Sequence, residues 1–76
     1  MQIYVKTLTG RKLLFDIEET DSLSILRDKV MESEGIDASQ IRMIHNGSQL
    51  NFTQTFEKTK IKSGDTIHLV LALRGG

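Results

Sequence analysis

Apolar and polar side chains alternate along two early segments of the chain. The positions that share one face of these segments are Ile3, Val5, Thr7, Leu13, Phe15 and Ile17. A period of two residues is typical of a strand with one buried face. Because Gly10 lies in the short connection between the segments and can adopt a positive φ, the pattern predicts an antiparallel hairpin.

The next segment has helical spacing. Leu23, Leu26 and Val30 recur at intervals of three and four residues, which puts them on one stripe of a helix. Ser22 is a suitable N-cap, and Gly35 can end a helix in the left-handed conformation. The sequence therefore predicts a helix over residues 23–34.

Three further strands are predicted in the second half of the chain. Residues 41–45 alternate, and Asn46-Gly47 is a strong signal for a tight hairpin into residues 48–50. Residues 66–71 form the last predicted strand. The residues expected in the core are Ile41, Met43, Phe56, Ile61, Ile67 and Leu69. The order of two strands, a helix and three strands predicts an α+β fold with one helix across a mixed sheet.

Composition and charge exclude several classes of function. The chain has 76 residues, with ten Lys and Arg, ten Asp and Glu, and no cysteine. Disulfides, thiol catalysis and Cys-based zinc sites are therefore excluded, and the balanced charge argues against binding to nucleic acid or to an anionic membrane. His45 and His68 lack the spacing of a nucleophile–base pair or of a metal site, so no catalytic residue and no metal is predicted. Since no apolar run is long enough to span a membrane, we expect one soluble intracellular domain.

Five motifs carry a resemblance to a known family. They are MQI at residues 1–3, KTLTG at 6–10, EGI at 34–36, HLVL at 68–71 and LRGG at 73–76. With these motifs in register from the first residue to the last, the chain resembles the ubiquitin family. The resemblance implies the β-grasp fold, which agrees with the predicted order of elements. We expect residues 1–71 to form the ubiquitin-like domain and residues 72–76, which have no core pattern, to form a flexible conjugation tail.

Ala72 separates two branches of this family. Ubiquitin carries an arginine at this position, whereas the ubiquitin-related modifier Rub carries an alanine, as this chain does. A guanidinium that loses its water needs an acidic partner, so a pocket that expects alanine rejects it. The resemblance thus implies that activating enzymes discriminate at Ala72, with Arg74 as a charge-assisted anchor of the tail. Gln2 and Tyr4 are ubiquitin-like, which leaves a divergent ubiquitin as an alternative.

The terminal Gly75-Gly76 is the reactive end that the resemblance implies. In the family the corresponding carboxylate is adenylated, passed to enzyme cysteines as a thioester and joined to a substrate lysine. The activating enzyme uses the ATP, so no cofactor is expected on this chain. Glycine suits the task because a backbone without Cβ can thread a narrow channel. An ordinary chain end that happens to finish in glycine is the alternative interpretation.

Apolar residues also occupy positions where strand alternation predicts polar ones. Ile44 and Val70 point outward from their predicted strands, and Leu8 lies at a hairpin tip with His68 nearby. Aliphatic side chains that converge on one sheet face indicate a protein-binding patch, which the resemblance also implies. Scattered surface aliphatics are the alternative. A second patch of the family corresponds to Ile36, Leu71 and Leu73, for which packing of the tail root is an equally good interpretation.

Lysines decide whether the protein can itself be modified. Lys6 and Lys29 are candidates, whereas Ser48 and Ser63 stand where ubiquitin has the two lysines it uses most for chains. Ordinary ubiquitin chains are therefore not expected. Further departures from the family are Glu19, Asp37 and Ala38 in place of prolines, and Thr59 in place of a tyrosine that braces a loop. We expect the loops near Asp37 and Thr59 to differ accordingly.

The sequence as a whole predicts a Rub-type modifier, attached through Gly76 to substrate lysines, and not an enzyme. The resemblance implies activating and conjugating enzymes, ligases, deconjugating proteases and cullin-like substrates as partners. It also implies a cytoplasmic and nuclear location, a monomeric free form, and no nucleic-acid or membrane partner. A non-conjugated docking domain is the alternative of another class, and a free Gly75-Gly76 end argues against it.

Overall fold

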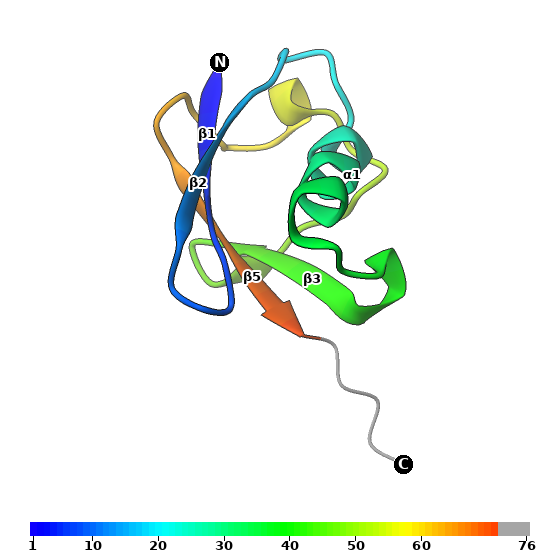
Figure 1. Ribbon diagram of the computed structural model, residues 1–76. Coiled ribbons are helices and arrows are strands. Elements are labelled where there is room, and N and C mark those ends of the chain that lie inside the picture. Colours follow the sequence, from blue (N-terminus) through cyan, green and yellow to red (C-terminus); the bar gives the residue numbers. More distant parts are fainter. Residues whose placement is uncertain (72–76) are drawn as a thin grey trace.

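The computed structural model describes residues 1–71, except for the side chain of Ala38. The strands are β1 (Gln2–Lys6), β2 (Lys12–Asp16), β3 (Ile41–His45), β4 (Ser48–Gln49) and β5 (Thr66–Leu71). The helices are α1 (Leu23–Glu34) and two short 3₁₀ helices, η1 (Ala38–Gln40) and η2 (Phe56–Lys58). The predicted order of strands and helix is confirmed, and α1 and β5 have the predicted bounds (Figure 1).

The strands form one mixed sheet. Their order across the sheet is β2-β1-β5-β3-β4, so the last strand of the chain lies in the middle. β1 and β5 run parallel, whereas β1 with β2, β3 with β5 and β3 with β4 are antiparallel. This pairing confirms the predicted mixed sheet and the predicted hairpin between β1 and β2.

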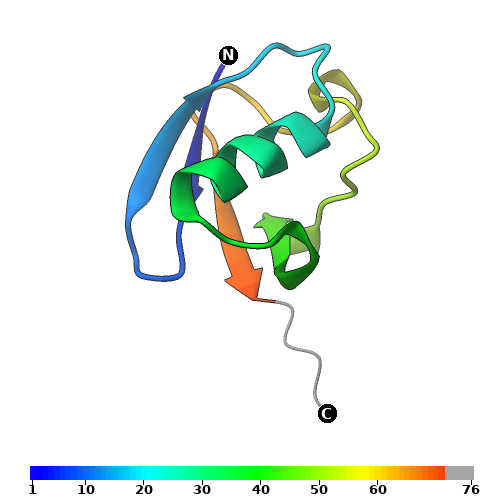
Figure 2. The same ribbon diagram turned by 45° about the vertical axis from the view of Figure 1, so that its right-hand side comes forward.

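The core lies between α1 and one face of this sheet, which the helix crosses (Figure 2). Its buried apolar residues are Ile3, Val5, Ile17, Leu23, Leu26, Val30, Ile41, Met43, Phe56, Ile61, Ile67 and Leu69. Leu13 and Phe15 also face inward but are only half-buried. The reason is that β2 is an edge strand, with a neighbour on one side only.

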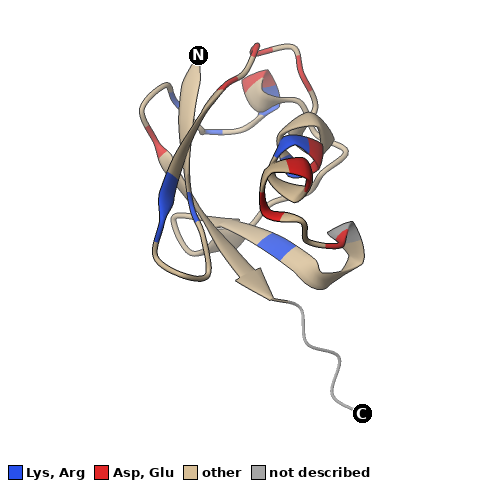
Figure 3. Ribbon diagram, in the orientation of Figure 1, with Lys and Arg blue, Asp and Glu red and all other residues tan. Residues whose placement is uncertain are grey.

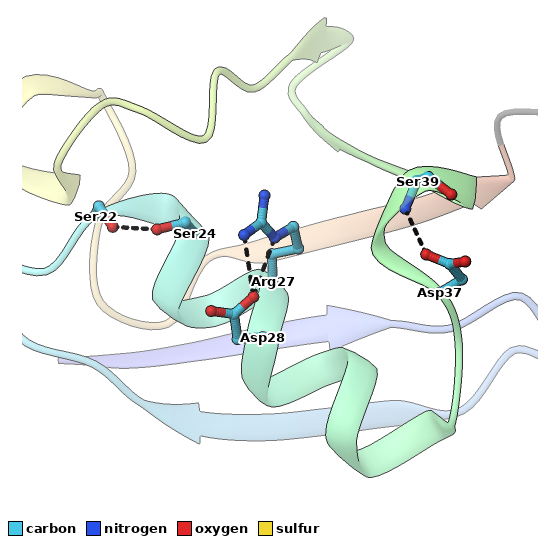
Figure 4. Close-up of polar contacts among 6 residues, drawn as sticks. All are labelled: Ser22, Ser24, Arg27, Asp28, Asp37 and Ser39. Atoms are coloured by element: carbon cyan, nitrogen blue, oxygen red, sulfur yellow. Dashed lines mark hydrogen bonds and ion pairs between the residues drawn. The ribbon is translucent and has the colours of Figure 1, made fainter.

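The ends of α1 are stabilised in different ways. Ser22 has the extended backbone of an N-cap, but its side chain makes no capping hydrogen bond and instead contacts the hydroxyl of Ser24 (Figure 4). The first amide groups of α1 donate to a neighbouring loop, Leu23 to the carbonyl of Gln54 and Ser24 to that of Phe52. At the other end Gly35 has φ of 67° and donates its N–H to the carbonyl of Met31, as a left-handed C-cap does.

The tight turn between β3 and β4 has the predicted geometry. Asn46 and Gly47 have φ of 51° and 81°, which are the two positive values that a type I′ turn requires. The turn allows His45 to pair with Ser48 and Ile44 with Gln49. It therefore fixes the register of the sheet edge next to the outward residue Ile44.

The two loops that lack family residues are closed by local hydrogen bonds. The Thr59 hydroxyl donates to the carbonyl of Phe56 at 2.7 Å and accepts the N–H of Ile61 at 3.2 Å. The Asp37 carboxylate accepts the N–H of Ser39 at 3.0 Å, at the start of η1 (Figure 4). Among the helices of residues 1–71, none is long and apolar enough to cross a membrane.

Candidate docking and conjugation site

The face of the sheet opposite α1 presents the predicted patch. Ile44 on β3 lies directly opposite His68 on β5, and Val70 follows two residues later on the same face of β5. On the other side of β5, Lys6 lies opposite His68 in parallel register, and Leu8 follows two residues later, in the turn between β1 and β2. Leu8, Val70 and His68 are exposed and Ile44 is half-buried. We call these four residues the outer patch.

The sheet register, more than exposure alone, distinguishes the outer patch from scattered surface aliphatics. Leu8 is 45% exposed and Val70 is 38% exposed, although both are large apolar side chains. The sheet register brings Ile44, His68 and Val70 onto neighbouring positions of two adjacent strands. A contiguous exposed apolar surface of this kind is typical of a protein interaction site.

Basic residues surround the outer patch. Lys6 lies opposite His68, Lys12 lies opposite Lys6, and Arg42 lies opposite Val70. Figure 3 shows these basic positions on β1, β2 and β3. The only acidic residue within the strands of residues 1–71 is Asp16. The sheet face thus presents an apolar centre with a positive rim, which complements a partner that carries carboxylates.

A polar contact between His45 and Asp65 lies next to the outer patch, at the end of β3. His45 is only 8% exposed, and its Nε2 lies 3.0 Å from Oδ2 of Asp65. The same carboxylate accepts the N–H of Lys62 at 2.9 Å. The Lys62 hydrogen bond and the contact with His45 hold the pKa of Asp65 below its usual value. The pair fixes the end of β3, immediately after Ile44, to the turn that leads into β5.

The sequence did not predict this pair. His45 and Asp65 are 20 residues apart in the chain, and each lies beside a turn where a polar residue is ordinary. The only sequence signal is a histidine at an inward position of an apolar strand, since Ile41 and Met43 share its face. A polar group at such a position needs a partner.

Tyr4 and Leu14 form the predicted cross-strand pair on the same sheet face. They lie opposite each other in the register of β1 and β2, and Leu14 is 49% exposed. The Lys12 ammonium lies 4.7 Å from the centre of the Tyr4 ring, which is a favourable cation–π distance. The pair is separated from the outer patch by Lys6 and Lys12, which lie opposite each other on the same face.

The second predicted patch is only partly described. Ile36 is half-buried and packs against the core, whereas Leu71 is exposed at the end of β5, opposite Ile41. Leu73 lies outside the described residues, as do the predicted tail residues Ala72, Arg74, Gly75 and Gly76. Their roles in this patch, in enzyme discrimination and in conjugation remain predictions.

The comparison with known families decides the identity of the fold. The sequence profile described as the ubiquitin family matches residues 3–74. The chain belongs to the ubiquitin family. This confirms the predicted β-grasp fold, because the mixed sheet and the single helix across it are those of that family.

Several members of the ubiquitin family match this chain over all 76 residues. The ubiquitin-like protein NEDD8 of Dictyostelium discoideum is 45% identical, with 99% of its length covered. The ubiquitin-like protein 1 of Schizosaccharomyces pombe is also 45% identical, with 97% covered. The NEDD8-like protein RUB3 of Arabidopsis thaliana is 40% identical, with 97% covered. These relatives confirm the predicted resemblance to the Rub branch of the ubiquitin family.

The two candidate lysines of this ubiquitin-family member are exposed, but they lie in different surroundings. Lys6 is on β1 beside the outer patch, and Lys29 is on α1, next to the buried Val30. Modification of Lys6 would cover part of the outer patch, whereas modification of Lys29 would leave the sheet face free. Within residues 1–71 no three His, Asp or Glu side chains are grouped closely enough to hold a metal ion.

Proposed function

We propose that this chain is a ubiquitin-like modifier of the NEDD8/Rub type, joined to lysines of other proteins through the carboxylate of Gly76. The observation that carries the proposal is its match to NEDD8- and RUB-named proteins over the entire chain, up to 99% of the relative's length.

In the proposed reaction the chain is the acyl donor. The Gly76 carboxylate attacks the α-phosphate of ATP on the activating enzyme, which releases diphosphate and leaves an acyl adenylate. An enzyme thiolate then displaces AMP to form a thioester, and a substrate lysine amine displaces the thiol to form the isopeptide bond. The chain itself supplies no catalytic group in this scheme, so we propose that it is not an enzyme.

The outer patch adds a recognition surface to the one proposed for the tail. Leu8, Ile44 and Val70 offer an apolar contact, and the basic rim of Lys6 and Arg42 favours partners with acidic side chains. β5 contributes Val70 and then ends at Leu71, immediately before the tail. An enzyme that docks on the outer patch therefore binds close to Leu71, the last described residue before the predicted tail.

The proposed partners are activating and conjugating enzymes, ligases, deconjugating proteases and substrates such as cullins. The proposed location is the cytoplasm and nucleus, with the free chain monomeric. Ala72 and Arg74 are the proposed residues for selection by the activating enzyme. An arginine at position 72 would have to lose water in a pocket without a matching carboxylate, which is unfavourable.

The experiment that tests the proposal is thioester formation with a purified Rub-type activating enzyme and ATP. The intact chain should form an adduct that a thiol reductant cleaves, and a chain without Gly76 should form none. A non-conjugated docking domain is the rival function, supported by the exposed outer patch. It would form no adduct in either case, yet both chains would still bind partners through Ile44.

A further inference from the structure

A pocket lies beside the outer patch, beyond the β4 edge of the sheet. It has a volume of about 470 Å³ and lies between the β3–β4 hairpin and the segment that follows it, residues 50–61. Its lining includes His45, Ser48, Asn51, Gln54, Thr59 and Lys60. This volume is within the usual range for a ligand site, and the lining also includes the apolar Leu50 and Ile61.

The charged groups of this pocket favour an anion. Lys60 is an exposed cation in the lining, and none of the lining residues is Asp or Glu. Within residues 1–71 no carboxylate lies within 4.0 Å of the Lys60 ammonium. The nearby carboxylate of Asp65 is already engaged by His45 and by the N–H of Lys62.

Hydrogen bonding among the lining residues also favours an anion. The side-chain oxygen of Asn51 accepts both the N–H and the hydroxyl of Thr53, at 3.0 and 2.8 Å. The hydroxyl of Thr59 already donates to one carbonyl and accepts one N–H. With the Asn51 oxygen occupied, its amide N–H groups remain as donors, together with the Lys60 ammonium. The pocket therefore offers hydrogen-bond donors to a ligand that accepts, such as a carboxylate.

The position of the pocket next to the outer patch indicates that the carboxylate belongs to a docked protein partner. Gln49 lines the pocket, pairs with Ile44 of the outer patch and accepts a hydrogen bond from Arg42 at 3.0 Å. A partner segment that leaves the outer patch across β4 thus passes Arg42 and reaches Lys60. Both are positive, and a segment rich in Glu or Asp complements both.

We propose that this pocket binds the carboxylate side chains of an acidic peptide segment in a partner that docks on the outer patch. The inference rests on the docking part of the proposed function and is independent of conjugation through Gly76. It adds a second contact surface, with its own specificity, on the far side of the hairpin from Val70.

The test is a titration of the full chain, labelled with ¹⁵N, with acetyl-Gly-Glu-Glu-Gly-amide and with its Gln-Gln counterpart. The Glu peptide should shift the signals of His45, Asn51 and Lys60 and bind about threefold more tightly than the Gln peptide, as one exposed ion pair permits. In Lys60→Gln this preference should disappear. In Lys58→Gln, which removes the same charge from the end of η2, outside the pocket lining, it should persist.

A second variant tests the pocket without changing its charge. Gln54→Trp places a large ring in the lining and keeps the backbone hydrogen bonds of residue 54, so it should abolish the shifts at His45. Equal binding of the two peptides, no binding, an unchanged preference in Lys60→Gln, or equal shifts with inorganic phosphate would each overturn the inference. Thioester formation on Gly76 is scored separately, so failure of the pocket and failure of the proposed function are distinguishable.

Discussion

Replacing Leu26 by alanine tests the packing that holds the sheet and its outer patch in place. Leu26 is 0% exposed and lies on the stripe of α1 that faces the sheet. The substitution removes three carbon atoms, and at about 0.8 kcal/mol for each buried CH₂ the transfer loss is about 2.4 kcal/mol. A partly unrelaxed cavity brings the expected loss in the free energy of unfolding to about 3 kcal/mol.

The matched control is Ile25→Ala, one residue earlier in the same helix. Ile25 is 38% exposed, and alanine has the higher helix propensity, so the expected loss is below about 1 kcal/mol. Urea unfolding followed by circular dichroism measures both variants. With a slope near 1 kcal/mol per molar urea, Leu26→Ala should lower the midpoint by about 3 M. Equal losses for the two variants, or a loss below about 1 kcal/mol for Leu26→Ala, would refute the packing of α1 described above.

Three further variants test the site and its supports. Asp65→Asn should reduce the loss of stability between about pH 5 and pH 2. The lowered pKa of Asp65 contributes stability that is present above the pKa of the unfolded state and is lost as the pH falls through the pKa of the folded state. Urea midpoints across that range measure the effect, and an unchanged pH profile would contradict it. Ile44→Ala should weaken partner binding about tenfold or more, with little change in the circular dichroism spectrum, whereas Ile25→Ala should bind normally in the same calorimetric titration. Gly35→Ala should lower stability by about 1 kcal/mol because φ is 67° there, although a Cβ would meet no neighbouring atom; a neutral result in thermal unfolding would show that α1 ends differently.

Local patterns in the sequence predicted most of the fold. The stripe of Leu23, Leu26 and Val30 with Gly35 after it predicted α1, and the Asn46-Gly47 pair predicted the β3–β4 turn. These signals are local, since each depends on residues a few positions apart. The strand alternation also predicted which residues face outward, so Ile44, His68 and Val70 could be assigned to one face before their pairing was known.

Features that depend on contacts between distant segments could not be predicted in the same way. The amide groups at the start of α1 are satisfied by the carbonyls of Phe52 and Gln54, not by the side chain of Ser22. The contact of His45 with Asp65 likewise joins two turns. No periodicity encodes such pairings, because they follow from how the loops pack once the sheet and helix have formed.

A competition between two activating enzymes separates a Rub-type modifier from a divergent ubiquitin. The chain is mixed with ATP, a Rub-type activating enzyme and a ubiquitin-activating enzyme, and the thioester on each enzyme is quantified. We expect adducts mainly on the Rub-type enzyme, and a shift toward the ubiquitin enzyme in Ala72→Arg. Charging of the native chain by the ubiquitin enzyme alone, or by neither enzyme, would contradict this expectation.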